Sequence, residues 1–136
     1  MSGASAEDIT QSHVLDASAM LAWLQGEPGG EVVEPLLSQA AISSVNWAEV
    51  LQRSIAYGVQ IEGMQADVEA LGLEILPFNA LDAERVAQLY QPTQPQGLSL
   101  GDRACLALAQ RLNLPALTAD RAWGGLDLSI EIQIIR

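Results

Sequence analysis

The chain has 136 residues, of which 49% are hydrophobic and 4% aromatic, and its six arginines, absent lysines and 17 acidic residues give a formal net charge of -11. This length accommodates one domain with a sizeable core of Leu, Ala, Ile and Val, but not two ordinary domains. The charge excludes broad, non-specific nucleic-acid binding, because affinity for phosphates comes mainly from cations that displace counterions. Any nucleic-acid contact must therefore be local, whereas a basic protein partner would be attracted.

The N-terminal residues and the cysteine content indicate the compartment. Residues 1–12 are polar, carry Glu7 and Asp8, and predict a disordered lead before a single domain at 13–136. They lack the basic start and apolar stretch of a signal peptide, and no run of the chain is long enough to span a membrane. Cys105 is the only cysteine, and its apolar helical surroundings predict a buried structural thiol. A cytoplasmic protein with no membrane contact is expected.

A strand followed by a helix occurs twice in the first half of the domain. Asp16 directly follows the first apolar stretch, and the breakers from Gly26 to Gly30 end the helix after it. In chain order the expected elements are a strand at 13–15, helices at 19–24 and 32–39, a strand at 41–43 and a helix at 44–57.

Helical spacing dominates the second half of the domain. Ser99 is an expected N-cap, and Asp102 completes the serine-x-x-acid pattern of a capping box. Ile61, Met64, Val68 and Leu71 form one apolar stripe at helical spacing. This stripe is expected to be part of the core, and the alternative is that it binds a partner. In chain order the expected elements are a helix at 61–71, a strand at 74–76, a helix at 83–90, a loop at 91–97, a helix at 100–112, and strands at 116–118 and 131–134.

The alternation of short apolar strands with helices predicts an α/β fold with a mainly parallel central sheet and helices on both faces. Ligand sites in such sheets form outside the carboxyl ends of the strands. Asp16 and Asp120 directly follow strands, and Glu49 lies near the start of the helix after the second strand. Asp102 opens a helix after a loop, so strand geometry alone does not place it at this edge.

These four acids have a structural and a functional interpretation. Asp16 and Asp120 could cap the turns that follow them, Asp102 could only complete its capping box, and Glu49 could do the same for Asn46. Four carboxylates at one edge favour the functional interpretation, because they repel one another unless a cation neutralises their charge. Mg²⁺ or Mn²⁺ does so through oxygen ligands while retaining water. The typical reaction of such a site is phosphodiester hydrolysis.

Four short motifs resemble those of a known family in order and spacing. They are VLDAS at 14–18, NWAE at 46–49, SLGDR at 99–103 and LTADR at 117–121. Together they resemble the motifs of PIN-domain ribonucleases of the VapC toxin type, over essentially all of 13–136. The resemblance implies a three-layer α/β/α PIN-like domain with a mainly parallel central sheet. It also implies a Mg²⁺- or Mn²⁺-dependent endoribonuclease that is the toxin of a toxin–antitoxin pair.

The resemblance also assigns roles to individual residues. The catalytic and metal-binding quartet comprises Asp16, Glu49, Asp102 and Asp120, and the polar residues that support it are Ser18, Asn46 and Thr118. The expected partners are an RNA substrate, a cognate antitoxin and a second copy of the chain in a homodimer. Arg103 and Arg121 each adjoin an acid, so they are candidates for RNA binding, with a solvated ion pair as the alternative.

Two other enzyme classes fail on the sequence, and one non-enzymatic alternative remains. The G-x-S-x-G pattern at 97–101 would need a preceding strand and a later histidine, but the sole histidine is His13. An aspartyl-phosphate phosphatase or a receiver domain would also place an aspartate after the first strand, but those families resemble each other in using a lysine to hold the phosphoryl group, and this chain has no lysine. The remaining alternative is a non-catalytic PIN-like module that binds a protein partner.

Overall fold

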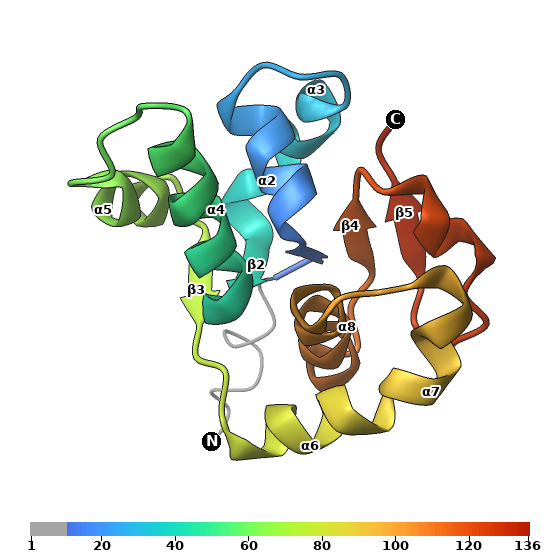
Figure 1. Cartoon of the computed structure of the whole chain (residues 1–136). Coiled ribbons are helices and arrows are strands. Elements are labelled where there is room, and N and C mark those ends of the chain that lie inside the picture. Colours follow the sequence, from blue (N-terminus) through green and yellow to red (C-terminus); the bar gives the residue numbers. More distant parts are fainter. Residues whose placement is uncertain (1–10) are drawn as a thin grey trace.

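The computed structural model describes residues 11–136, and its centre is one sheet of five strands (Figure 1). Residues 1–10 of the expected N-terminal lead lie outside the described residues. The strands are β1 (His13–Leu15), β2 (Ala40–Ser43), β3 (Glu74–Leu76), β4 (Ala116–Thr118) and β5 (Ile132–Ile134). Their order is β3-β2-β1-β4-β5, and every neighbouring pair is parallel. The expected mainly parallel sheet is confirmed.

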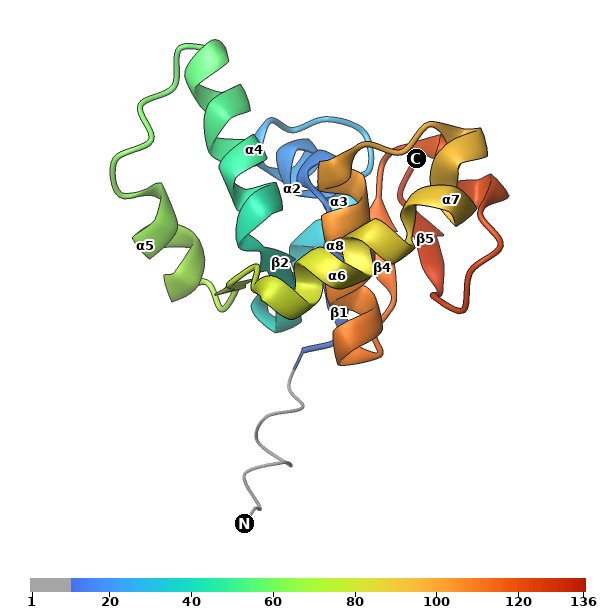
Figure 2. The same cartoon turned by 60° about the horizontal axis from the view of Figure 1, so that its bottom comes forward.

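Helices cover both faces of this sheet. The α-helices are α2 (Ala17–Leu24), α3 (Gly30–Val33), α4 (Ser44–Ala56), α5 (Met64–Ala70), α6 (Ala80–Gln88), α7 (Tyr90–Thr93) and α8 (Leu100–Leu112). The 3₁₀ helices are η1 (Glu34–Gln39), η2 (Gln94–Gln96) and η3 (Arg121–Gly125). In Figure 2, α6 crosses in front of α8, and α4 and α2 lie beside each other.

The alternation of side chains along the strands divides the core into two clusters, one on each face of the sheet. Leu15 and Leu117 pack in the cluster that includes residues of α2, α4 and α5. Their neighbours Val14 and Ala116 pack in the other cluster, with residues of α6 and α8. Successive strand residues point to opposite faces, so these two clusters establish the three-layer α/β/α architecture.

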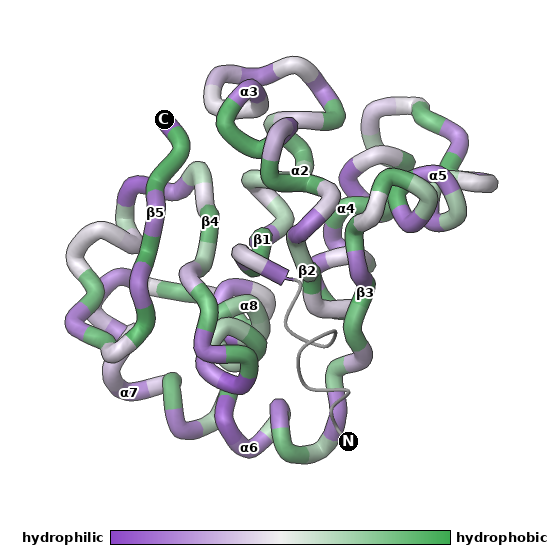
Figure 3. Tube along the Cα trace, turned by 180° about the vertical axis from the view of Figure 1, so that it is seen from behind, coloured by the Kyte–Doolittle hydropathy of each residue, from purple (hydrophilic) through white to green (hydrophobic). Residues whose placement is uncertain are grey.

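Helix α8 is the most deeply buried helix of this fold. Seven of its residues are buried, from Gly101 through Ala109, and Figure 3 colours most of the helix in the green of hydrophobic residues. Cys105 lies fully buried among them as a free thiol, as expected. Burial raises the pKa of this thiol well above its usual range, and the charges of nearby acids raise it further. Cys105 is therefore a structural residue rather than a nucleophile.

Several expected boundaries are wrong for identifiable reasons. The helix expected at 32–39 is α3 followed by η1, and Pro35 at the start of η1 lacks the amide that a continuous α-helix would use. The helix expected from residue 61 begins only at Met64, because Gly63 adopts a left-handed backbone with φ of 82°. The loop expected at 91–97 contains most of α7 and all of η2.

The apolar stripe of the 61–71 segment is only partly core. Val68 is buried and Met64 packs against the same cluster, as expected for a core stripe. Leu71 is 49% exposed, so the core interpretation is wrong for this residue. Within residues 11–136, no helix has both the length and the apolar character needed to cross a membrane.

A buried ion pair joins α6 to α8. The Nε of Arg111 donates to Oδ1 of Asp82 at 3.0 Å, and the Asp82 side chain is 3% exposed. Asp82 also accepts the Asn79 amide in the capping box that starts α6. Removal of Arg111 would leave a buried carboxylate without its cation, which is costly.

The substitution Arg111→Ala is therefore expected to destabilise the protein by about 2–3 kcal/mol. Urea unfolding at pH 7.5 measures this loss. Arg85→Ala is the matched control, because Arg85 lies on α6 and makes no side-chain hydrogen bond within the described chain. Equal stability of the two variants would show that the ion pair contributes nothing.

Candidate active site

The four acids singled out from the sequence line a single open pocket of about 280 Å³ at the carboxyl edge of the sheet. Asp16 follows β1 and is the N-cap of α2, and Asp120 follows β4 and is the N-cap of η3. Glu49 lies in the second turn of α4, and Asp102 in the first turn of α8. Four separate segments thus contribute one carboxylate each to this pocket, which lies at the edge of the sheet where the sequence placed Asp16, Glu49 and Asp120.

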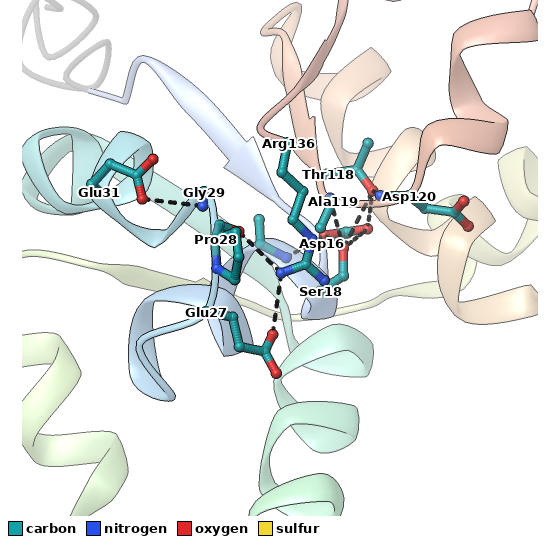
Figure 4. A network of polar contacts seen from close by, with 11 residues as sticks. Asp16, Ser18, Glu27, Pro28, Gly29, Glu31, Thr118, Ala119, Asp120 and Arg136 are labelled. Atoms are coloured by element: carbon teal, nitrogen blue, oxygen red, sulfur yellow. Dashed lines mark hydrogen bonds and ion pairs between the residues drawn. The ribbon is translucent and has the colours of Figure 1, made fainter.

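Asp16 is the most enclosed of these carboxylates, with only 4% of the residue exposed. Its Oδ1 accepts hydrogen bonds from the Ala19 amide and the Ser18 hydroxyl, both at 2.8 Å, and its Oδ2 accepts from the Thr118 hydroxyl at 2.6 Å (Figure 4). Burial raises the pKa of Asp16 to about 6. The three hydrogen bonds act in the opposite direction, and the charge of Asp102 adds a small further rise.

Ser18 and Thr118 connect Asp16 to the end of β4. The Ser18 hydroxyl accepts the Ala119 amide at 2.9 Å, and the Thr118 hydroxyl accepts the Asp120 amide at 3.0 Å. Because each hydroxyl also donates to Asp16, the backbone of the LTADR motif is held against the first carboxylate. The two hydroxyls expected to support the acids therefore contact them directly (Figure 4).

Glu49 is positioned by Asn46 and by a close approach to α8. The Asn46 side-chain amide donates to Oε1 of Glu49 and to the Gly101 carbonyl, both at 2.9 Å. A Cβ on Gly101 would lie 2.5 Å from Oε2 of Glu49, so only glycine leaves room for this carboxylate. The alternative that Glu49 completes a capping box for Asn46 is wrong, because Ser43 caps α4.

Gly101 is a site residue that sequence reasoning missed. The sequence does contain an indication of this role. A glycine inside a helix destabilises the helix relative to alanine, so its presence there indicates that a neighbouring group packs too closely for a side chain. The reason here is the adjacent carboxylate of Glu49 rather than a turn.

The capping roles of the three aspartates are also real. Asp102 Oδ2 accepts the Ser99 amide at 2.9 Å while the Ser99 hydroxyl accepts the Asp102 amide at 3.1 Å, which completes the capping box. Asp120 Oδ1 accepts the Ala122 amide at 3.0 Å. Among residues 11–136, Oδ1 of Asp102, Oδ2 of Asp120 and Oε2 of Glu49 receive no hydrogen bond. Each of these acids thus caps or braces its segment with one oxygen and keeps the other available.

The donor set suits a hard divalent cation in its chemistry. All four groups are carboxylates, which are the ligands that Mg²⁺ and Mn²⁺ prefer, and their mutual repulsion would be relieved by positive charge. In the part of the chain that the structure describes, no three carboxylate, imidazole or thiol groups stand close enough together to hold a metal ion. The acids therefore surround the pocket without forming an assembled coordination shell.

The two arginines expected to bind RNA lie outside this pocket. Arg103 Nη1 donates to the Val86 carbonyl at 2.8 Å, and its guanidinium stands 5.3 Å from the centre of the Tyr90 ring. Arg121 Nε donates to the Arg136 carbonyl at 3.0 Å. The sole histidine is likewise remote, since His13 contacts Ser12 and Gln133.

Two other arginines line the pocket and were missed from the sequence. Arg136 is engaged, because its Nη1 donates to the Pro28 carbonyl at 3.0 Å and contacts Oε1 of Glu27 at 3.4 Å (Figure 4). Arg53 lies on α4 four residues after Glu49. The sequence does indicate this position of Arg53, since residues four apart share a helix face and Arg53 therefore lies on the same face as Glu49.

Comparison with known proteins identifies a family model, described as the PIN domain, that matches residues 13–127. No curated protein matches the sequence significantly. Similar solved structures include a toxin–antitoxin complex from Klebsiella pneumoniae, with 24% identity, a TM-score of 0.65 and coverage of 84% of this chain and 92% of that chain.

Two further structures show the same fold. VapBC2 from Rickettsia felis, bound to a DNA fragment from its promoter, has 19% identity, a TM-score of 0.66 and coverage of 93% of this chain and 100% of that chain. VapBC-1 from nontypeable Haemophilus influenzae has 19% identity, a TM-score of 0.62 and coverage of 91% and 98%. At these identities the likeness establishes the fold alone.

Proposed function

We propose, since the chain belongs to the PIN domain family, that it is a metal-dependent endoribonuclease and the toxin of a toxin–antitoxin pair. The observation that carries the nuclease proposal is the pocket into which four segments deliver one carboxylate each. The similar structure from Klebsiella pneumoniae is a toxin–antitoxin complex, which supports the toxin assignment.

The site residues divide into ligands and supports. Asp16, Glu49, Asp102 and Asp120 would hold Mg²⁺ or Mn²⁺, which when bound supplies a Lewis acid that activates water and stabilises the leaving oxygen. The supporting residues keep the carboxylates in place before the ion arrives. Ser18 and Thr118 donate to Asp16 and thereby favour its ionised form.

Asn46 has the corresponding role for Glu49. Its side-chain amide donates one hydrogen bond to the Glu49 carboxylate and another to the Gly101 carbonyl, so it fixes α4 against the first turn of α8. Because its two donors are used in this way, replacement by an apolar residue would leave Glu49 free to rotate. Partners of this kind typically contribute about 10–100-fold to metal affinity or activity.

Metal-dependent cleavage tests the nuclease proposal. The purified full chain is incubated with single-stranded RNA after EDTA treatment, with and without added Mn²⁺. Cleavage that is lost in EDTA and restored by Mn²⁺ supports the enzyme. Intact RNA together with no metal uptake at millimolar concentration would favour the alternative, a non-catalytic PIN-like module that binds a protein partner.

The same proposal extends to partners and location. A chain of net charge -11 suits a basic antitoxin, whose arginine or lysine would be attracted to the acidic pocket. We further propose a homodimer and a cytoplasmic location, where RNA is accessible. Co-purification with the antitoxin and size-exclusion chromatography test the assembly, and a strictly monomeric chain without a partner would contradict it.

The substitution Gly101→Ala is expected to move the Glu49 carboxylate while leaving the stability of the fold nearly unchanged. The added Cβ would displace the end of the flexible Glu49 side chain, at 2.5 Å, rather than any backbone. Stability should therefore stay within about 1 kcal/mol, because alanine also favours the helix, while Mn²⁺-dependent cleavage falls about 10–100-fold. Thermal unfolding and cleavage rates measure the two effects, and full activity would show that the position of Glu49 is unimportant.

A further inference from the structure

Besides the carboxylates, the pocket is lined by residues on or next to α2 and α4, two helices that contact each other and are neighbours in Figure 1. On the α2 side it is lined by Leu21 and Gln25, and on the α4 side by Glu49, Arg53 and Tyr57. Glu49, Arg53 and the C-cap residue Tyr57 are spaced four residues apart, so each lies about 6 Å further along the helix axis than the one before. These three residues form one wall of the pocket, which runs from an acid to a cation and then to an aromatic ring.

Arg53 is the cation of this wall. It is exposed, and its guanidinium makes no hydrogen bond or ion pair within residues 11–136, although five acids line the same pocket. Arg136, the other arginine of the pocket, is held by Glu27 and Pro28. A guanidinium presents a planar set of donors that matches a phosphate group in two-point contact. Arg53 is therefore placed to bind a phosphate close to the carboxylates.

Tyr57 completes the wall at the end of α4. It is the C-cap of this helix, it lines the pocket, and it is 60% exposed. An aromatic ring on the rim of a nucleic-acid groove provides a surface on which an unpaired base stacks. Bases of double-stranded RNA are already stacked in the helix, so this contact selects single-stranded segments or loops.

We propose that Arg53 and Tyr57 form a nucleotide subsite of the endonuclease, in which Arg53 binds a phosphate next to the scissile one and Tyr57 stacks the base attached to it. The subsite rests on the proposed nuclease function and adds two substrate-binding residues to the four carboxylates. It also explains how a strongly acidic chain can bind RNA without a general basic surface, since Arg53, which has no hydrogen bond or ion pair within residues 11–136, lines the same pocket as the carboxylates.

The test compares RNA with a small substrate that lacks the neighbouring nucleotide. Cleavage of a single-stranded oligoribonucleotide and hydrolysis of bis(p-nitrophenyl) phosphate are measured with Mn²⁺ for the parent, Arg53→Gln and Tyr57→Ala. Both substitutions should raise KM for RNA about tenfold, and should affect RNA at least ten times more than the small diester. Arg53→Gln should also reduce the slope of log affinity against log salt by about 0.7.

Control variants and a binding measurement distinguish failure of the subsite from failure of the nuclease function. Arg85→Gln removes the same charge from α6, outside the pocket, and should resemble the parent, and Tyr57→Phe should retain the affinity that Tyr57→Ala loses. Fluorescence anisotropy with labelled RNA reports binding independently of cleavage. An active parent whose Arg53→Gln variant matches Arg85→Gln in KM and salt slope would overturn the subsite alone. A parent inactive on both substrates would overturn the nuclease function and the subsite with it.

Discussion

Asp16→Asn is expected to reduce Mn²⁺-dependent RNA cleavage by at least about 10³-fold, because it removes the charge of the most enclosed of the four carboxylates. Asparagine has nearly the same shape, its oxygen can still accept the hydrogen bonds of Ala19 and Ser18, and its amide nitrogen can donate to the Thr118 hydroxyl, which would then act as acceptor. The loss should therefore come from chemistry rather than from unfolding. Cleavage rates of purified parent and variant at equal Mn²⁺ concentration measure the effect.

The same substitution is expected to stabilise the metal-free protein at neutral pH. The pKa of Asp16 rises from 3.8 to about 6, mainly through burial, so folding favours the protonated form. The parent has its full relative stability below about pH 4 and loses it as the pH rises through about 6. Above that range the buried charge costs about 3 kcal/mol, and asparagine avoids this cost.

Urea unfolding in EDTA at pH 5 and pH 8 measures this linkage. The stability advantage of Asp16→Asn should be about 1–2 kcal/mol larger at pH 8 than at pH 5. Asp127→Asn is the control, because Asp127 is exposed and outside the pocket, and it should show no such difference. An advantage that is the same at both pH values would contradict the buried position of an ionisable Asp16, and a variant that cleaves like the parent would remove it from the site.

Asp102→Asn should lower cleavage by at least about 100-fold, whereas Ser99→Ala should retain activity within a few fold. Both residues belong to the same capping box, so this pair separates capping from metal binding. The asparagine oxygen can still accept the Ser99 amide, so helix α8 keeps its start. Ser99→Ala removes the capping hydroxyl and should cost about 1 kcal/mol while the carboxylate remains.

Cleavage rates and urea unfolding of the two variants distinguish these roles. If Ser99→Ala lost as much activity as Asp102→Asn, the carboxylate would serve only as a cap. If Asp102→Asn lost stability without losing activity, the same conclusion would follow.

The sheet and the position of the site were predictable because they depend on local patterns. Short apolar runs marked all five strands to within one residue, and the rule for parallel sheets placed Asp16 and Asp120 at one edge. The placement of Asp102 came from the family resemblance, since the helix it opens follows a loop. The PIN domain match over 13–127 confirms that resemblance at the level of the family.

Features that depend on tertiary neighbours were not predictable in the same way. Arg103 adjoins an acid in sequence, but its side chain reaches Val86 on α6, whereas Arg53 reaches the pocket without adjoining an acid. Trp123 lies in the short 3₁₀ helix η3, yet it is fully buried. A side chain's surroundings in such cases follow from which helix packs over it, and spacing along the chain does not contain this information.

We propose that four carboxylates from four segments of the chain bind one kind of divalent metal ion. Titration of Mn²⁺ into the metal-free protein at pH 7.5, followed by calorimetry, tests it most directly. Saturable binding is expected for the parent and for Asp127→Asn, with a loss of about 10-fold or more in affinity for Asp16→Asn. Equal affinity in the parent and Asp16→Asn, or no saturable binding in the parent, would contradict the claim.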